Sequence, residues 1–339
     1  MTDRIPPSGL PLASHAPGKA ILFGEHAVVF GKTAVVLALD MGTDLEISGL
    51  RGTGSGTYNG SERAARANPY LQTSLLAHPP PQPLDLRCRS QLPRASGLGS
   101  SAAFTAGLMT ALLGMEGGAE RTTLALESFR AERQAQGVGS PVDTSAAVAG
   151  GVLSVGARAP GEKLWELPAE DGRPAWHVAR LPDPGWTWVV GFTGVPKDTA
   201  TVVRRVGERV KAPDGPRLLE QIDSLALQGC DALRAGDRAA VGRLMNENQR
   251  QLVELGISHP RLDDLMRSVE KLAVGAKITG AGGGGSIIVL PCPGDELRVG
   301  QAISHAGGVP FVVKVAARGA SVQPLTGGPQ PPGTGGRRA

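Results

Sequence analysis

Apolar residues along the chain form two kinds of run, one typical of buried strands and one typical of amphipathic helices. Continuous apolar and β-branched runs predict buried strands at Ser14–Phe23, Thr33–Leu39 and Trp186–Thr193, with a further short apolar piece at Ala27–Gly31. From Leu84 to Arg89 apolar and polar residues alternate, which predicts a half-exposed strand.

Helical spacing dominates the second half of the chain. Composition and spacing predict helices at Phe104–Leu113, Glu120–Gln136, Thr199–Lys211, Arg217–Ala235 and Arg238–Leu255. We expect a further helix capped by Ser258, because Pro260 suits a first turn and the apolar residues that follow are three and four positions apart.

Two segments lack such patterns. Gly49 to Pro83 is rich in Gly, Ser, Pro and Arg, which predicts a long surface loop or a mobile insert. From Pro324 onward the chain consists of Pro, Gly and Thr with a basic end, which predicts a disordered tail.

Composition narrows the class of protein. With 339 residues, of which 41% are hydrophobic, the chain is long enough for two globular domains. The net charge is only +4 and no basic stripe is visible, so we expect no nucleic-acid partner. The three cysteines are far apart, which predicts neither a disulfide framework nor a cysteine metal site. No apolar run or leader suggests a membrane span or signal peptide, so we expect a cytoplasmic protein.

The stretch from Pro93 to Ala103 is the strongest candidate for chemistry. Gly97 and Gly99 allow a tight turn, and Ser100 and Ser101 precede a run of helix formers. The free N–H groups of a new helix would then point at the turn, as in an anion-binding site. The alternative is a simple Gly-Ser turn with a serine N-cap, because short glycine motifs often match by chance. The stretch matches neither a Walker A loop nor a dinucleotide fingerprint.

Three other places carry candidate groups. Lys19, Glu25 and His26 lie within eight residues beside a buried strand, an unusual density of ionisable groups. A second glycine run, Gly280–Gly285, separates two β-rich pieces and requires unusual backbone angles or a close approach. Asp143 begins an Ala-rich segment, where it is either an N-cap or a functional carboxylate.

Three motifs stand in one order, and in that order the chain resembles the GHMP kinase superfamily, which phosphorylates alcohols with ATP. They are Pro17–His26, Gly97–Ala103 and Lys277–Gly285. Within the superfamily the chain is most similar to the mevalonate kinases, because Gly24–Val29 reads Gly-Glu-His-Ala-Val-Val where galactokinases have Gly-Glu-His-Thr-Asp. Thr193–Thr199 and Asn248–His259 add to the likeness, which spans roughly Ala16 to Leu290.

The resemblance implies an α+β fold of two domains, a ribosomal-protein-like N-terminal domain and a ferredoxin-like C-terminal domain, with the active site in the cleft between them. The expected limits are residues 1–185 for the N-terminal domain, 186–323 for the C-terminal domain and 324–339 for the tail. A homodimer is left open.

The resemblance also implies roles for individual residues. It makes Asp143 and Lys19 catalytic, with Asp143 accepting the proton of the primary hydroxyl of mevalonate, and it makes Ser101 and Glu132 ligands of Mg²⁺. The residues expected at the ATP phosphates are Pro93, Gly97, Leu98, Gly99, Ser100, Ser101, Ala102 and Ala103. Those expected at the mevalonate site are Lys19, Glu25, His26, Asp143, Thr193, Gly280, Ala281 and Gly282.

The sequence departs from the family pattern at two positions. Ser140-Pro141-Val142-Asp143 stands where the family usually has Ser-Gly-Val-Asp, and Ser286 stands where it often has cysteine.

Two rival functions stay open at this point. One is another kinase of the superfamily such as phosphomevalonate kinase, whose substrate would require an additional cation, for which Lys197 is the candidate. The other is a sensor that has lost catalysis. The presence of all four residues assigned to catalysis or metal argues against the sensor.

Overall fold

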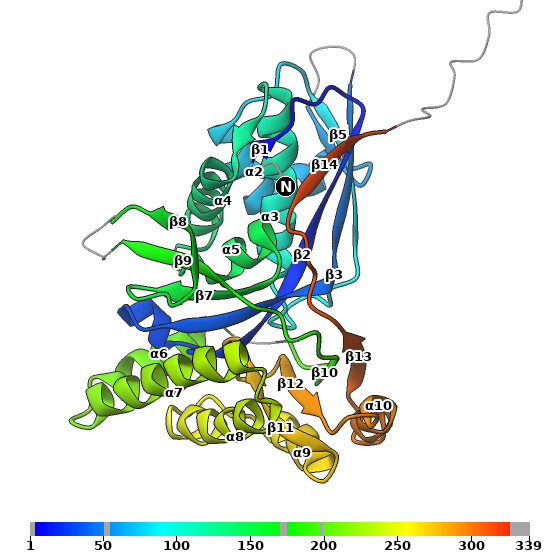
Figure 1. Cartoon of the computed structure of the whole chain (residues 1–339). Coiled ribbons are helices and arrows are strands. Elements are labelled where there is room, and N and C mark those ends of the chain that lie inside the picture. The colour runs from blue at the N-terminus through cyan, green and yellow to red at the C-terminus, as the bar shows by residue number, and fades with distance from the viewer. Residues whose placement is uncertain (1–3, 51–54, 138, 170–174, 197–198, 326–339) are drawn as a thin grey trace, which may run out of the picture.

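The computed structural model describes residues 4–50, 55–137, 139–169, 175–196 and 199–325. Two main sheets, antiparallel except for one short pair of strands, and their helices build the described part, with the N-terminal half above and the helix-rich C-terminal half below in Figure 1. The α+β class expected from the sequence is confirmed.

The larger sheet is organised around two long neighbouring strands that pair along most of their length. Its order is β14 (Ser321–Pro324), β2 (Leu12–Phe23), β3 (Ala34–Gly49), β7 (Val152–Gly156), β9 (Trp176–Leu181) and β8 (Glu162–Leu167). β5 (Leu84–Ser90) pairs with β3, and β4 (Thr57–Tyr58) pairs with β5. A separate ribbon joins β1 (Arg4–Ile5) to β6 (Ala119–Glu120).

Most helices of the N-terminal half pack against this sheet and against one another, whereas the short helix η1 contacts α7. They are η1 (Ala27–Phe30), α1 (Glu62–Ala67), α2 (Pro69–Ala77), α3 (Ser100–Met115), α4 (Arg121–Gln136) and α5 (Val142–Ala149). α3 is buried on nearly all sides and its small residues lie close to β2, which places the first turn of α3 beside that strand.

The smaller sheet has the order β11 (Ala273–Thr279), β12 (Ser286–Pro291), β10 (Trp188–Phe192) and β13 (Val309–Val313). Around it lie α6 (Thr199–Val210), α7 (Gly215–Ala235), α8 (Arg238–Glu254), α9 (Pro260–Val269) and α10 (Glu296–His305).

The smaller sheet is buried on both faces, which explains why its central strands are apolar without alternation. Val189 and Val289 belong to the core formed with the C-terminal helices. Their neighbours Trp188, Val190 and Ile288 belong instead to the core of the N-terminal half. The two halves therefore share a continuous apolar interior at this sheet.

Most predicted strands and helices are confirmed, with ends shifted by a few residues. β3 runs ten residues beyond the predicted end at Leu39, and the apolar piece after Gly24 is the short helix η1 rather than an extended segment. The disordered tail was expected to begin at Pro324, but Pro324 is the last residue of β14. Residues 326–339 lie outside the described part, so the rest of the expected tail stays a prediction. The domain limits stay a prediction.

The expected loop at Gly49–Pro83 is wrong. Outside the undescribed residues 51–54, the segment contains β4, α1 and α2. The Ser61 side chain caps α1 by accepting from the Ala64 N–H, and the Asn68 side chain caps α2 by accepting from the Leu71 N–H. Ser61 and Asn68, polar residues that suggested a loop, are therefore the N-caps of two helices.

The predicted cap at Ser258 is also wrong, and of the two alternatives left open for Asp143 the N-cap does not hold. The N-cap of α9 is His259, whose side chain accepts from the Arg261 N–H, while the Ser258 hydroxyl donates to Asp263. The N-cap of α5 is Pro141, so Asp143 lies inside the first turn of the helix rather than at its cap. This leaves the Asp143 carboxylate available for other contacts.

α7 packs on β2 through a glycine, and this contact is testable. A Cβ on Gly229 would lie 2.5–3.1 Å from ring atoms of the buried Phe23. We expect Gly229→Ala to lower the free energy of unfolding by about 1–3 kcal/mol, because overpacking outweighs the better helix propensity of alanine. Denaturant unfolding measures this. Gly207→Ala on α6 is the matched control, since nothing lies within 4 Å of its Cβ position, and it should be neutral or stabilising.

Candidate active site

Lys19 and Asp143 form the polar centre of the site. The Lys19 Nζ lies 3.1 Å from the Asp143 Oδ1, and the two side chains are 3% and 30% exposed. Lys19 comes from β2, where its backbone N–H donates to the Leu98 carbonyl at 2.9 Å, and Asp143 comes from the first turn of α5. A buried ammonium therefore meets a carboxylate that solvent still reaches.

The turn before α3 packs directly against this pair. Gly97 and Gly99 both have positive φ, 84° and 77°, and Gly99 is the N-cap of α3. A Cβ on Gly99 would lie 2.8 Å from the Lys19 Cγ, so only glycine combines this backbone angle with this approach. The first N–H groups of α3, at Ser100 and Ser101, lack intrahelical acceptors and favour an anion at the turn.

Ser101 and Glu132 are brought together, as predicted. The Ser101 hydroxyl donates to the Glu132 Oε1 at 2.8 Å, and the Gln136 Nε2 donates to the same oxygen at 2.9 Å. Tyr70 of α2 reaches the Ser101 and Gln136 side chains, and burial, followed by the negative charge of Glu132, raises the pKa of its hydroxyl.

This oxygen set fits a hard cation. A serine hydroxyl, a carboxylate and the oxygens of a nucleotide phosphate are ligands that Mg²⁺ prefers. Among the residues that the structure describes, no group of three or more His, Cys, Asp and Glu side chains could hold a metal by itself. The pair Ser101 and Glu132 thus suits a metal that arrives with phosphate rather than a permanent metal centre.

The second glycine run lies between β11 and β12 and against the first glycine turn. The Thr279 hydroxyl donates to the Ile21 carbonyl at 3.0 Å and accepts from the Ile21 N–H at 2.8 Å. A Cβ on Gly280 would lie 3.2 Å from the Gly97 carbonyl oxygen. The Ser286 hydroxyl donates to the Ser96 carbonyl at 2.9 Å. Both glycine loops are therefore fixed to each other.

The remaining predicted residues lie in or beside these loops. His26, whose φ is 61°, has its Nε2 2.9 Å from the Ala281 carbonyl oxygen. The Thr193 hydroxyl donates to the Gly285 carbonyl at 2.8 Å, which makes it a support of the second loop. The Pro93 carbonyl accepts from the Ser96 hydroxyl at 2.7 Å. The others, which are buried except for the half-buried Ala281, are Leu98, Ala102, Ala103, Ala281 and Gly282.

Glu25 is engaged by Lys277, the first residue of the third motif, for which the sequence predicted no role. Its Oε1 forms an ion pair with the Lys277 Nζ, and the two side chains are 1% and 0% exposed. Burial raises the pKa of Glu25, against the opposing positive charges of Lys277 and Lys19. Burial likewise lowers the pKa of Lys277. The available signal was a single lysine inside the apolar strand Ala273–Thr279.

Two further residues beside the Ser101–Glu132 pair were not predicted. Gln136 stands one helical turn after Glu132, so the spacing could have placed its amide beside that carboxylate. Tyr70 carried no signal, because its segment was expected to be a loop.

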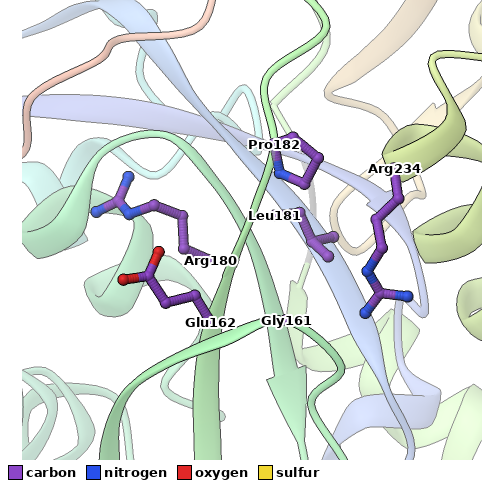
Figure 2. Close-up of a pocket in the computed structure, with 6 residues that line it drawn as sticks. All are labelled: Gly161, Glu162, Arg180, Leu181, Pro182 and Arg234. Carbon is purple, nitrogen blue, oxygen red and sulfur yellow. The ribbon is translucent and has the colours of Figure 1, made fainter.

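A surface cavity of about 480 Å³ lies elsewhere. Figure 2 shows its lining: Gly161, Glu162, Arg180, Leu181, Pro182 and Arg234. The Arg180 guanidinium donates to the Ala149 and Gly150 carbonyls at the end of α5. None of the lining residues is among the predicted site residues, so this cavity is not the candidate site.

None of the helices in the described part of the chain is both long enough and apolar enough to cross a membrane.

Comparison with known proteins places the chain among small-molecule kinases. Residues 62–151 match the GHMP kinases N terminal domain and residues 231–308 match the GHMP kinases C terminal domain. A protein named mevalonate kinase from Methanothermobacter thermautotrophicus is 33% identical over 294 residues, covering 83% of this chain and 90% of that protein.

Solved structures agree in fold. The Methanococcus jannaschii mevalonate kinase matches with a TM-score of 0.74 at 24% identity, covering 91% of this chain and 100% of that chain. The L. major mevalonate kinase in complex with R-mevalonate matches with a TM-score of 0.72 at 23% identity, covering 89% of this chain and 94% of that chain.

Proposed function

The chain belongs to the mevalonate kinases of the GHMP kinase family, and on that premise we propose how its site transfers the γ-phosphoryl group of ATP to mevalonate. The products are 5-phosphomevalonate and ADP. The observation that supports the residue roles is the Lys19–Asp143 pair, held beside the glycine turn at the start of α3.

Phosphoryl transfer requires alignment and charge neutralisation more than covalent chemistry. In our proposal Asp143 accepts the proton of the primary hydroxyl, since its carboxylate is the solvent-reached member of the pair. The Lys19 ammonium stabilises the negative charge that develops on that oxygen. Because Lys19 is held by the Leu98 carbonyl and by Gly99, its position depends directly on the phosphate turn.

The family's use of ATP implies a divalent metal, and we propose that this metal is Mg²⁺ held by Ser101 and Glu132. When bound, the ion neutralises phosphate charge and orients the transferred group. The backbone N–H groups of Ser100 and Ser101, at the start of α3, donate hydrogen bonds to phosphate oxygens in this proposal. Gln136 and Tyr70 support the two ligands from α4 and α2.

We propose that mevalonate contacts Asp143, the Gly24–His26 turn and the Gly280–Gly282 loop. Phosphomevalonate is the rival substrate, and its candidate cation Lys197 lies outside the described residues. Turnover of the wild-type enzyme with ATP and each alcohol tests the assignment. Better turnover of phosphomevalonate than of mevalonate would overturn it, and ATP binding without ADP release would favour a sensor.

Asp143→Asn tests the proton acceptor. We expect the turnover number to fall roughly 10²–10⁴-fold, because the amide cannot take the hydroxyl proton. Fold and ATP affinity should persist, since Asn is isosteric and the ATP phosphates bind at α3. Steady-state kinetics, calorimetric ATP titration and melting measure the three quantities. Near wild-type turnover would remove Asp143 from the mechanism.

Ser101→Ala and Glu132→Gln test the metal ligands. Each should raise the Mg²⁺ concentration needed for half-maximal rate, because an oxygen ligand is lost or weakened. Titration of Mg²⁺ at fixed ATP, with Mn²⁺-ATP binding followed by electron paramagnetic resonance, measures this. Ser100→Ala is the matched control, expected to change metal dependence less. An unchanged metal requirement in both ligand variants contradicts the assignment.

His26→Ala tests the mevalonate side. Loss of a hydrogen bond to a charged group costs about 1.5–3 kcal/mol, so the KM for mevalonate should rise far more than the KM for ATP. The His26 backbone has φ of 61° and ψ of −43°, outside the left-handed helical region that asparagine favours, so His26→Asn keeps a polar side chain at this position without relieving the backbone strain. Equal changes in both KM values, with melting unchanged, would show that His26 makes no substrate contact.

A further inference from the structure

The Lys277–Glu25 ion pair is the most deeply buried charged contact in the described ranges, and the proposed chemistry does not use it. Glu25 follows β2 and Lys277 lies on β11, so the pair joins the two halves of the chain. Buried ion pairs contribute little net stability, because desolvation of both charges offsets their attraction. Stability of the fold therefore does not explain why these two charges are buried together.

The contacts of the pair are also incomplete. The Lys277 Nζ donates a second hydrogen bond to the Ile278 carbonyl at 2.6 Å. The Glu25 Oε2, in contrast, is buried without a hydrogen-bond partner among the residues that the structure describes. An apolar pair of similar volume would avoid this cost.

What the pair does hold is a turn with unfavourable backbone angles. Gly24 and His26 have φ values of 87° and 61°, and such an angle in a residue other than glycine costs free energy. Two contacts from one segment hold this turn in place: Lys277 holds Glu25, and the Ala281 carbonyl holds the His26 ring. β11 and the loop that follows it thus clamp the turn from one side.

The clamp lies beside the reacting groups. The positive charge of Lys19 opposes the effect of burial on the pKa of Glu25, and it adds to the effect of burial on the pKa of Lys277. The same Lys19 contacts Asp143. Ala276 and Ile278 face the core of the C-terminal helices, so Lys277 and Thr279 share the opposite face of β11, where Thr279 bonds to Ile21 two residues after Lys19.

We propose that Lys277 is a positioning residue of the active site. Through the buried carboxylate of Glu25 it fixes the Gly24–His26 turn against the Gly280–Gly285 loop, and so sets the mevalonate side of the site. The expected effect on mevalonate turnover rests on the proposed function. The expected effect on the position of the Gly24–His26 turn rests on its geometry alone.

The decisive variant is the double replacement Glu25→Gln with Lys277→Met, which removes both charges at nearly constant volume. We expect melting below the wild type, because the new amide is buried without a partner, but no unpaired charge stays buried. The kcat/KM for mevalonate should fall roughly 10–100-fold, since a small displacement of a positioned group is costly. The KM for ATP should stay within about threefold of the wild type, because the clamp is not at the phosphate turn.

Two single variants serve as references. Lys277→Met alone leaves the Glu25 carboxylate unpaired and should melt lower than the double variant. Val289→Ala, on the neighbouring strand but in the opposite core, is the control for stability loss, and its kcat/KM for mevalonate should stay at the wild-type level. If the double variant keeps wild-type kcat/KM, the pair has no positioning role.

A histidine NMR experiment makes the test independent of the substrate. The ring signals of His26 are identified as those lost in His26→Asn. They should shift in the double variant without any ligand and stay in place in Val289→Ala. If they shift but the wild type does not phosphorylate mevalonate, the proposed function fails and the clamp stands. If the wild type is active and neither the signals nor kcat/KM change, the inference alone is overturned.

Discussion

The close backbone approach of the two glycine loops is the constraint on which the site depends. A Cβ on Gly97 would lie 3.2 Å from the Thr279 carbonyl oxygen, and a Cβ on Gly280 equally close to the Gly97 carbonyl oxygen. A side chain at either position would be tightly packed and strained by the positive φ, so the loop of the C-terminal half lies directly against the Gly97–Gly99 turn of the N-terminal half. Thr279 and Ser286 fix this contact through hydrogen bonds to Ile21 and Ser96.

The charged groups of the site follow from this contact. Because backbone meets backbone, the side chains on either side of the contact are buried, and charges there must find partners. Lys19 is paired with Asp143, and Glu25 with Lys277. The first pair keeps one partly exposed carboxylate and the second keeps none. Reactivity can therefore reside in the first pair, while the second is suited to holding the backbone.

The residues of the candidate site could be selected from the sequence because they lie in motifs whose spacing reflects one local structure each. Ser101 follows a glycine turn and lies in the first turn of α3, which fixes where its hydroxyl points. Lys277 could be seen as a lysine in an apolar strand, but its partner Glu25 is 252 residues away and no local pattern encodes such a pairing. Tyr70 depends on α2, a helix concealed by its capping residues Asn68 and Pro69, which resemble loop composition.

Both departures from the family pattern fall where the backbone already accommodates them. Pro141 is the N-cap of α5 with φ of −76°, close to the angle that proline prefers, and its carbonyl accepts from the Ser145 N–H at 2.8 Å. The helix therefore begins normally, and Asp143 still meets Lys19. Ser286 adds a hydroxyl that donates to the Ser96 carbonyl, a stronger tie than a thiol would give. The sequence thus varies at supporting positions while the contact between the two glycine loops is preserved.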